Sequence, residues 1–224
     1  MWNNKLKAVT FSYDDGVNSD IKLAELFNKY NLKCTFNVNS GLIGDNGRWK
    51  HKDFDVYHLD AQTLKEAYKG HEVAAHGVFH KRLAELSPAE AFAEMKDDAD
   101  SIAKVFGERP IGMAYAYGSV NETAEKAVAD AGLKYGRGVR SSRSFSIPPR
   151  LINFCPTAHH DDTQIFELAE KFAALTPESP ALFYIWGHSY ELDGNKNWDK
   201  FERLLELLAG RDDIFYGTNK EVLL

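Results

Sequence analysis

Cysteine is scarce in this chain. Among 224 residues there are only Cys34 and Cys155, and they stand far apart in the sequence. Cys34 lies in an apolar-rich run, where a free cysteine behaves as a small buried hydrophobic residue. A disulfide framework is therefore not expected, and we predict two buried free thiols.

Long apolar runs are absent as well. A membrane-spanning helix needs roughly 18 or more consecutive apolar residues, and the sequence contains no such run. Residues 1–5 also lack the apolar core of a signal peptide. We therefore predict no membrane span and expect a cytoplasmic protein.

An excess of positive charge is missing too. The formal net charge is −6 and the isoelectric point is near 5.8. Binding to nucleic acid, or to an anionic membrane surface, requires a basic face, so we expect neither as the main partner. Apolar residues, by contrast, make up 44% of the chain, which is enough for a sizeable core.

Segments typical of strands and helices alternate along the chain, with no linker, repeat or low-complexity tract between them. We therefore predict one domain over residues 1–224. The best marked helix starts at Ser87-Pro88-Ala89-Glu90, which combines an N-cap, a proline at the first helical position and a capping-box glutamate. Strands are predicted near residues 8–13, 33–37, 72–75, 112–116, 135–139, 181–186 and 214–216, and helices near 20–30, 61–68, 88–106, 122–130, 164–175 and 198–209.

This alternation predicts an α/β fold, with a mostly parallel sheet and helices outside it. About seven strands predict a closed or nearly closed barrel, and a doubly wound open sheet is the alternative. The barrel is favoured because polar residues follow several predicted strands, and the carboxyl ends of barrel strands meet at one mouth. The residues in these positions are Asp14, Asp15, His76, Tyr117, Arg140 and His188.

The first predicted strand ends in two adjacent carboxylates, Asp14 and Asp15. Neighbouring side chains on an extended chain point in opposite directions, so the two can have different roles. One carboxylate and two imidazoles suit a divalent ion such as zinc, cobalt or nickel, and three protein ligands leave a position open for water. We predict that Asp15, His76 and His80 bind one such ion. An acidic cluster stabilised by a helix N-terminus is the alternative, but it does not explain the place of these residues at a strand end.

Asp14 is then the predicted general base, since a divalent ion acidifies water and a nearby carboxylate can take the proton. His188 follows the apolar strand predicted near 181–186 and is the predicted general acid. A core histidine satisfied by backbone groups is the alternative for His188.

Four segments resemble, in order, the motifs of the polysaccharide deacetylases, the NodB-homology domains of carbohydrate esterase family four. They are Thr10-Phe11-Ser12-Tyr13-Asp14-Asp15-Gly16, His76-x-x-x-His80, Tyr115-Ala116-Tyr117-Gly118 and Trp186-Gly187-His188. The resemblance implies a distorted (β/α)7 barrel and metal-dependent hydrolysis of acetyl groups, mostly N-acetyl groups on amino sugars. By position the resemblance implies that Asp14 is the base and His188 the acid. It implies Asp15, His76 and His80 as the metal ligands, and it adds the backbone N–H of Tyr117 as a contact to the oxyanion.

The sequence departs from the family pattern at two places. Ala114 stands where the third motif usually carries an arginine that orients the base. Arg140, or Arg137, could supply that charge from the next strand; we predict Arg140, with a surface arginine as the alternative. An aspartate that orients the catalytic histidine also has no clear match, and the candidates are Asp161, Asp162 and Glu191.

Substrate contacts are predicted for Trp186, Tyr190 and His160. Aromatic faces stack well on sugar rings, and His160 belongs to a polar segment that either lines the cleft or forms a solvated loop. The function we predict is a metal-dependent deacetylase acting on an acetylated oligosaccharide or small glycoside. The alternatives are a metal-dependent amidohydrolase acting on a non-sugar amide and a catalytically impaired saccharide-binding protein of the same fold.

Overall fold

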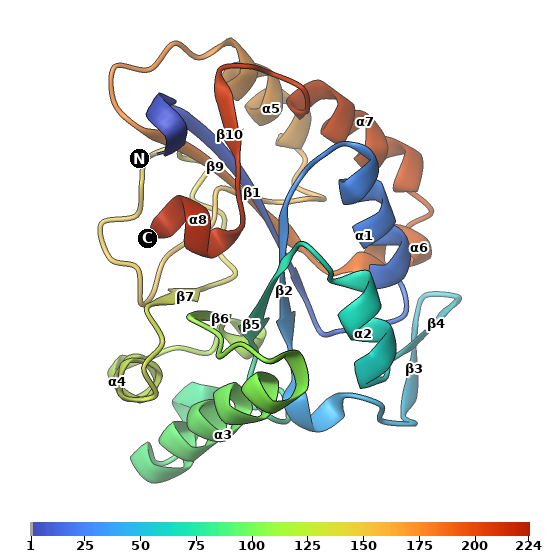
Figure 1. Cartoon of the computed structure of the whole chain (residues 1–224), viewed down its shortest axis with the longest axis vertical. Helices are drawn as coiled ribbons and strands as arrows, with labels where there is room; N and C mark the ends of the chain where they lie inside the picture. The colour runs from blue at the N-terminus through green and yellow to red at the C-terminus, as the bar shows by residue number, and fades with distance from the viewer. Residues whose placement is uncertain (1) are drawn as a thin grey trace.

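A parallel sheet of eight strands forms the centre of the molecule. The computed structural model describes residues 2–224. Seven strands follow one another in the order β7-β6-β5-β2-β1-β9-β8, and the eighth, β10, pairs with the first half of β1 (Figure 1). The strands of this sheet are β1 (Lys7–Asp14), β2 (Cys34–Val38), β5 (Glu72–Ala75), β6 (Gly112–Ala114), β7 (Tyr135–Arg137), β8 (Ala158–His159), β9 (Ala181–Gly187) and β10 (Ile214–Tyr216).

Irregular chain joins the two edge strands of this order. The backbone N–H groups of Gly136 and Gly138, on and just after β7, donate to the carbonyls of Leu151 and Phe154, both at 2.8 Å. The chain then runs directly from Phe154 into β8. The sheet therefore curves into the predicted distorted (β/α)7 barrel, and the alternative of an open doubly wound sheet is wrong.

Helices cover the outside of the barrel, with α1, α2 and α7 along one side in Figure 1. Phe11 and Tyr13 of β1 face these helices, since their rings lie 4.8 and 5.9 Å from the ring of Phe27 in α1. The alternate residues of β1 must then face inward. The helices are α1 (Asp20–Lys29), α2 (Ala61–Ala67), α3 (Pro88–Phe106), α4 (Glu122–Asp130), α5 (Ile165–Ala174), α6 (Ser189–Gly194), α7 (Trp198–Leu208) and α8 (Asn219–Leu223).

The inner face of β1 is polar and carries a chain of buried hydrogen bonds. Thr10 donates to the side chain of Asn219, which donates in turn to Ser12 at 3.2 Å. Asn37 of β2 donates to Ser12 and to Asp14, both at 2.8 Å. Because buried polar groups need partners, this column fixes the position of Asp14 at the carboxyl end of the barrel.

Several elements were not predicted from the sequence. They are the hairpin of β3 (Arg48–His51) and β4 (Phe54–Tyr57), the short strand β8, and the helices α6 and α8. The predicted capping box of α3 is confirmed, with Ser87 N–H donating to Glu90 at 3.0 Å. Cys34 and Cys155 are free thiols, as predicted, but only Cys34 is buried, and Cys155 is partly exposed.

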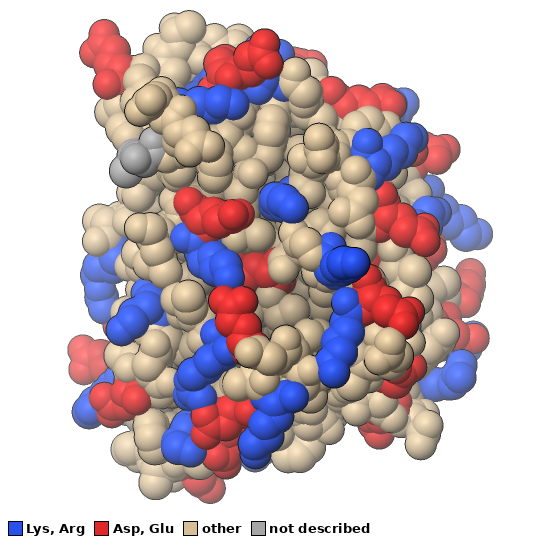
Figure 2. All heavy atoms as spheres, in the orientation of Figure 1, with Lys and Arg blue, Asp and Glu red and all other residues tan. Residues whose placement is uncertain are grey.

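The surface has no large patch of one charge on the face drawn in Figure 2, where basic and acidic side chains alternate. Within residues 2–224, no helix is both long and apolar enough to span a bilayer.

Candidate active site

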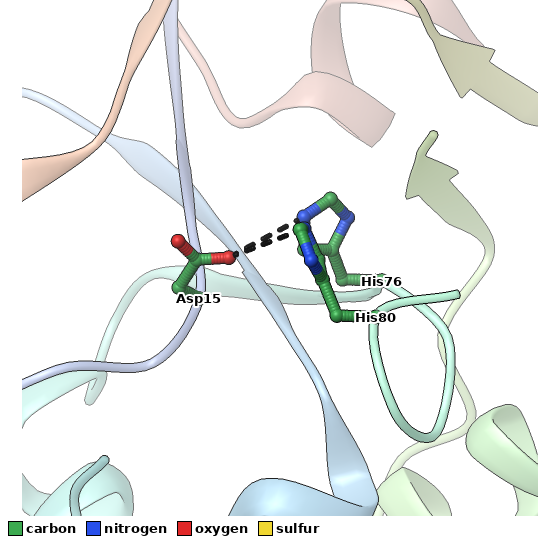
Figure 3. Close-up of side chains that lie close together, drawn as sticks. All are labelled: Asp15, His76 and His80. Atoms are coloured by element: carbon green, nitrogen blue, oxygen red, sulfur yellow. Dashed lines mark ion pairs between the residues drawn. The ribbon is translucent and has the colours of Figure 1, made fainter. Parts of the chain in front are cut away.

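The three predicted metal ligands meet at the carboxyl end of the sheet. Oδ1 of Asp15 lies 3.5 Å from Nε2 of His76 and 3.7 Å from Nε2 of His80, and Figure 3 shows both rings beside that carboxylate. Ligand atoms about 2.1 Å from one tetrahedral ion stand about 3.4 Å apart. The three atoms can therefore share one ion.

The backbone at the end of β1 separates the two aspartates. Asp15 has a φ of 88°, a left-handed conformation that aspartate tolerates better than most residues, and its N–H donates to the carbonyl of Asn37 at 3.0 Å. Asp14 stays on the strand and faces the barrel interior, while Asp15 lies at the rim. The strand end thus gives one carboxylate to the metal site and keeps the other for a different role.

Two carboxylates of α3 hold the loop that carries both histidines. Oδ2 of Asp98 accepts the backbone N–H groups of His76 and Gly77 at 3.0 and 2.8 Å, and Glu94 accepts the N–H of Phe79 at 2.8 Å. The His-x-x-x-His pair therefore lies in a turn-like loop rather than in a helix. The sequence had left both arrangements open.

The donor set fits a divalent cation. Nδ1 of His76 lies 2.7 Å from the carbonyl oxygen of Ala114, which can only accept, so Nδ1 carries the proton and Nε2 has the free lone pair. Nε2 is buried and has no hydrogen-bond partner. An unpaired buried nitrogen is unfavourable, and a cation shared with Asp15 and His80 would satisfy it.

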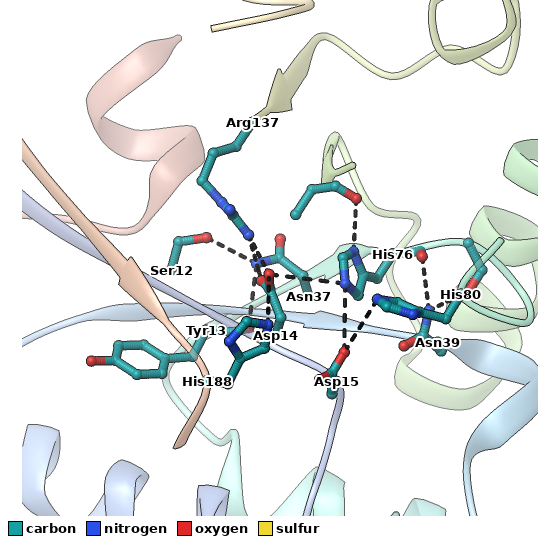
Figure 4. A network of polar contacts seen from close by, with 12 residues as sticks. Ser12, Tyr13, Asp14, Asp15, Asn37, Asn39, His76, His80, Arg137 and His188 are labelled. Carbon is teal, nitrogen blue, oxygen red and sulfur yellow. Dashed lines mark hydrogen bonds and ion pairs between the residues drawn. The ribbon is translucent and has the colours of Figure 1, made fainter. Parts of the chain in front are cut away.

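Asp14 forms a fully buried ion pair with Arg137 (Figure 4). Nη2 of Arg137 lies 2.6 and 2.5 Å from the two carboxylate oxygens, and the exposed fraction is 0% for Arg137 and 2% for Asp14. Burial alone would raise the pKa of Asp14, but Arg137, together with His76 and His188, outweighs it and lowers that pKa. Asp14 is therefore an ionised carboxylate, as a general base must be.

The prediction of Arg140 as the partner of the base was wrong. Arg140 is exposed, and its side chain contacts Cys155. Arg137, the alternative, supplies the charge because it lies within β7, whereas Arg140 lies beyond the strand end. The sequence did contain a signal for Arg137, because it lies inside a predicted strand that must be buried. Buried arginines are paired, so an acidic partner was to be expected.

Trp186, predicted as a substrate contact, lies against the buried ion pair, and its contact with a substrate stays a prediction. Trp186 is only 7% exposed, and the guanidinium of Arg137 lies 4.4 Å from its ring centre. Its aromatic face therefore supports the buried ion pair.

His188 stands next to Asp14 and is oriented by Glu191. Nε2 of His188 lies 4.0 Å from Oδ2 of Asp14, and Nδ1 lies 3.3 Å from Oε2 of Glu191. Burial would lower the pKa of His188, but the close contact with Glu191 and the charges of Asp15, Glu191 and Asp14 raise it to about 9. Of the three candidate acidic partners, Glu191 is therefore the one that acts on His188. Asp161 instead binds Asn195, and Asp162 pairs with Arg143.

His160 is not a cleft residue, contrary to the prediction. It is 3% exposed, and its Nδ1 lies 3.0 Å from the hydroxyl of Tyr13. Its neighbour His159 occupies the mouth instead, with Nε2 3.0 Å from Oε2 of Glu191. Sequence reasoning did not separate the two histidines.

Tyr117 and Tyr190 lie at the mouth. Tyr117 is 54% exposed, has a φ of 58° and packs against His80, with ring centres 4.4 Å apart. Tyr190 is half-buried between His188 and Trp49 of the hairpin, at 5.2 and 6.0 Å between ring centres. Their roles in binding an oxyanion and a sugar stay predictions.

Comparisons with known proteins agree with this geometry. A family model described as polysaccharide deacetylase matches residues 3–136. This range contains Asp14 and the three residues of the metal site, and it ends just before Arg137. No curated protein matches the sequence.

Solved structures share the fold. The deacetylase PplD of Streptococcus pyogenes, in complex with acetate, is 25% identical with a TM-score of 0.56, and the match covers 64% of this chain and 61% of that one. A family 4 carbohydrate esterase from Streptomyces lividans, also in complex with acetate, is 17% identical with a TM-score of 0.58, covering 96% and 92%. A mutant of a family 4 pseudoenzyme with restored activity is 16% identical with a TM-score of 0.64, covering 99% and 68%.

Proposed function

The chain belongs to the polysaccharide deacetylase family, and we propose that it is a metal-dependent hydrolase that removes acetyl groups, above all N-acetyl groups, from a saccharide. One observation carries this proposal. Oδ2 of the buried, ionised Asp14 lies 3.9 Å from Nε2 of His76 in the metal site and 4.0 Å from Nε2 of His188. Amide hydrolysis needs a base, an electrophile and an acid within such a short span.

Asp14 is the group that takes the proton from the attacking water. Arg137 and Asn37 hold its carboxylate in place and keep it charged. A divalent ion bound by Asp15, His76 and His80 would polarise the acetyl carbonyl and stabilise the negative charge that develops on its oxygen. Zinc suits this donor set best, and cobalt and nickel also fit.

His188 is the group that protonates the leaving amine. The carboxylate of Glu191, 3.3 Å from its Nδ1, favours the imidazolium form, and its Nε2 is on the side of Asp14, where the reacting amide would lie. The backbone N–H of Tyr117 is the further donor proposed for the oxyanion. An acid and a base on the two sides of one carbonyl allow the amine to leave as it is protonated.

The substrate class proposed is an acetylated oligosaccharide or small glycoside, with Tyr190 as the sugar contact. A catalytically impaired saccharide-binding protein loses its main support, because it depended on the missing arginine and Arg137 supplies that charge.

Acetate release tests the proposal. Zinc-loaded protein is incubated with chitooligosaccharides, chromogenic acetyl esters and a non-sugar N-acetyl amide. We expect release from the saccharide at the highest kcat/KM. Preference for the non-sugar amide would favour the amidohydrolase alternative, and no release from any of the three would refute the proposal.

The Asp14→Asn variant tests the base. We expect it to retain one tightly bound zinc ion and to lose turnover by at least about 100-fold, which is the usual contribution of a general base. Asp212→Asn is the matched control, since Asp212 is exposed and lies outside the site. Turnover by Asp14→Asn at the rate of this control would remove Asp14 from the mechanism.

A further inference from the structure

Three imidazole rings surround one carboxylate oxygen beside the proposed acid. Oε2 of Glu191 lies 3.0 Å from Nε2 of His159, 3.3 Å from Nδ1 of His188 and 3.6 Å from Nε2 of His160. It also accepts the backbone N–H of His188 at 3.1 Å. These groups come from β8, from the end of β9 and from the first turn of α6, so the tertiary structure alone brings them together.

The proton of His159 is on the nitrogen that faces Glu191. Nδ1 of His159 accepts the backbone N–H of Asp161 at 3.1 Å, and in a neutral imidazole the nitrogen that accepts leaves the proton on the other one. Nε2 of His159 is therefore a donor toward Glu191. Its distance of 3.0 Å is the shortest of the three imidazole contacts.

The contact between Nδ1 of His188 and Oε2 of Glu191 is longer than the His159 contact and is not a well-formed hydrogen bond. Nδ1 of His188 is buried and makes no well-aligned hydrogen bond, although Oε2 of Glu191 is 3.3 Å away. One carboxylate oxygen thus divides its interaction between two imidazoles, and His159 has the shorter contact. Glu191 cannot approach His188 more closely while His159 and the backbone hold it.

We propose that His159 is a positioning residue that acts through Glu191 on His188, because its Nε2–H restrains the carboxylate and so limits how strongly the carboxylate at Nδ1 stabilises the imidazolium form of His188. This inference rests on the proposed function, in which His188 protonates the leaving group. A carboxylate that bound His188 without restraint would hold the imidazolium more strongly and make it a weaker acid.

Two substitutions separate this role from packing. His159→Phe keeps a flat ring that can pack on Trp186, whose ring centre lies 4.7 Å away, but removes the donor. His159→Gln keeps an N–H donor near the position of Nε2. All proteins carry the same bound zinc, so the effect of the ion on His188 is common to them.

The first measurement is the titration of the His188 ring by nitrogen-15 NMR, which needs no substrate. The charged groups that act on this ring are Glu191, Asp14 and Asp15, and none of them is changed. We expect the pKa of His188 to move upward in His159→Phe and to stay close to that of the wild type in His159→Gln. An unchanged pKa in His159→Phe, or an equal shift in both variants, would overturn the inference.

The second measurement is the pH profile of kcat. In His159→Phe the descending limb at high pH should move upward with the pKa of His188, and kcat at neutral pH should fall by about three- to tenfold with little change in KM. His159→Gln should recover most of this loss. If the wild type hydrolyses no acetylated saccharide, the proposed function fails, while the NMR result still decides whether His159 acts on His188.

Discussion

Removing the buried arginine tests the central feature of the site. Arg137 and Asp14 are 0% and 2% exposed and lie 2.5 Å apart at their closest atoms. Substituting Arg137 by Met would leave the carboxylate buried without its partner. Removal of one partner of such a pair costs about 3–5 kcal/mol of the free energy of unfolding. The free energy of unfolding of a domain is about 5–15 kcal/mol in total, so this loss is a large fraction of it.

The measurement is urea unfolding of metal-free protein at pH 7, followed by circular dichroism. The control is Arg150→Met, since Arg150 pairs with Glu125 at 2.5 Å but its side chain is 67% exposed. Exposed pairs contribute about 0–1 kcal/mol. Comparing the two variants separates the effect of burial from that of losing an arginine.

A double variant tests whether the cost comes from the stranded charge. Asp14→Asn removes that charge and keeps an oxygen that can accept from Asn37. In the background of Arg137→Met, we expect it to recover at least about 2 kcal/mol, because the neutral side chain no longer needs a counter-ion. The reasoning is refuted if Arg137→Met costs no more than Arg150→Met, or if the two changes simply add.

Three further predictions concern the metal site, a buried acid and the core. His80→Ala should lose the tightly bound ion, measured by elemental analysis after desalting, and full occupancy would contradict its assignment as a ligand of the Asp15 site. Burial raises the pKa of Asp20 to about 7 despite hydrogen bonds to its carboxylate. The folded protein therefore binds this proton more tightly than the unfolded chain does. The resulting contribution to the free energy of unfolding is full below about pH 4 and is lost as the pH rises to 7. Asp20→Asn should remove this decline, which is on the order of 4 kcal/mol in urea unfolding, and an unchanged pH dependence would contradict the assignment. Gly187→Ala would place a Cβ 2.0 Å from Nδ1 of His160, so we expect a loss of about 1–3 kcal/mol, and a wild-type melting curve would show that the ring can move aside.

The regular elements were largely predictable because their signals are local. The predicted ranges 72–75, 88–106, 122–130 and 214–216 coincide with observed elements. The hairpin of β3 and β4 carries no such signal, since each strand has only four residues and Val56 alone among them is buried. It is held by contacts with α6, including the rings of Trp49 and Tyr190, and a contact between distant segments leaves no periodic pattern in either one.

The residues of the site divide in the same way. Asp14, Asp15, His76 and His80 could be found because they lie at or soon after the ends of β1 and β5, and both strand ends are visible in the sequence. Asn37 was missed, although it is the register partner of Asp14 on the neighbouring strand. Pairing register depends on how two strands lie against each other, and a single sequence does not contain that information.

The amino-acid order alone determined that a parallel barrel forms and that a carboxylate and two imidazoles stand at its mouth, since strand ends, caps and residue types act over a few neighbouring positions. Tertiary structure decided between Arg137 and Arg140, between His159 and His160, and between Glu191 and two other acids. Side chains alternate across a strand, so a shift of one residue separates His159 from His160. Arg137 and Glu191 were selected because β7 and α6 pack beside Asp14 and His188, and contacts between distant segments are set only by the packed barrel.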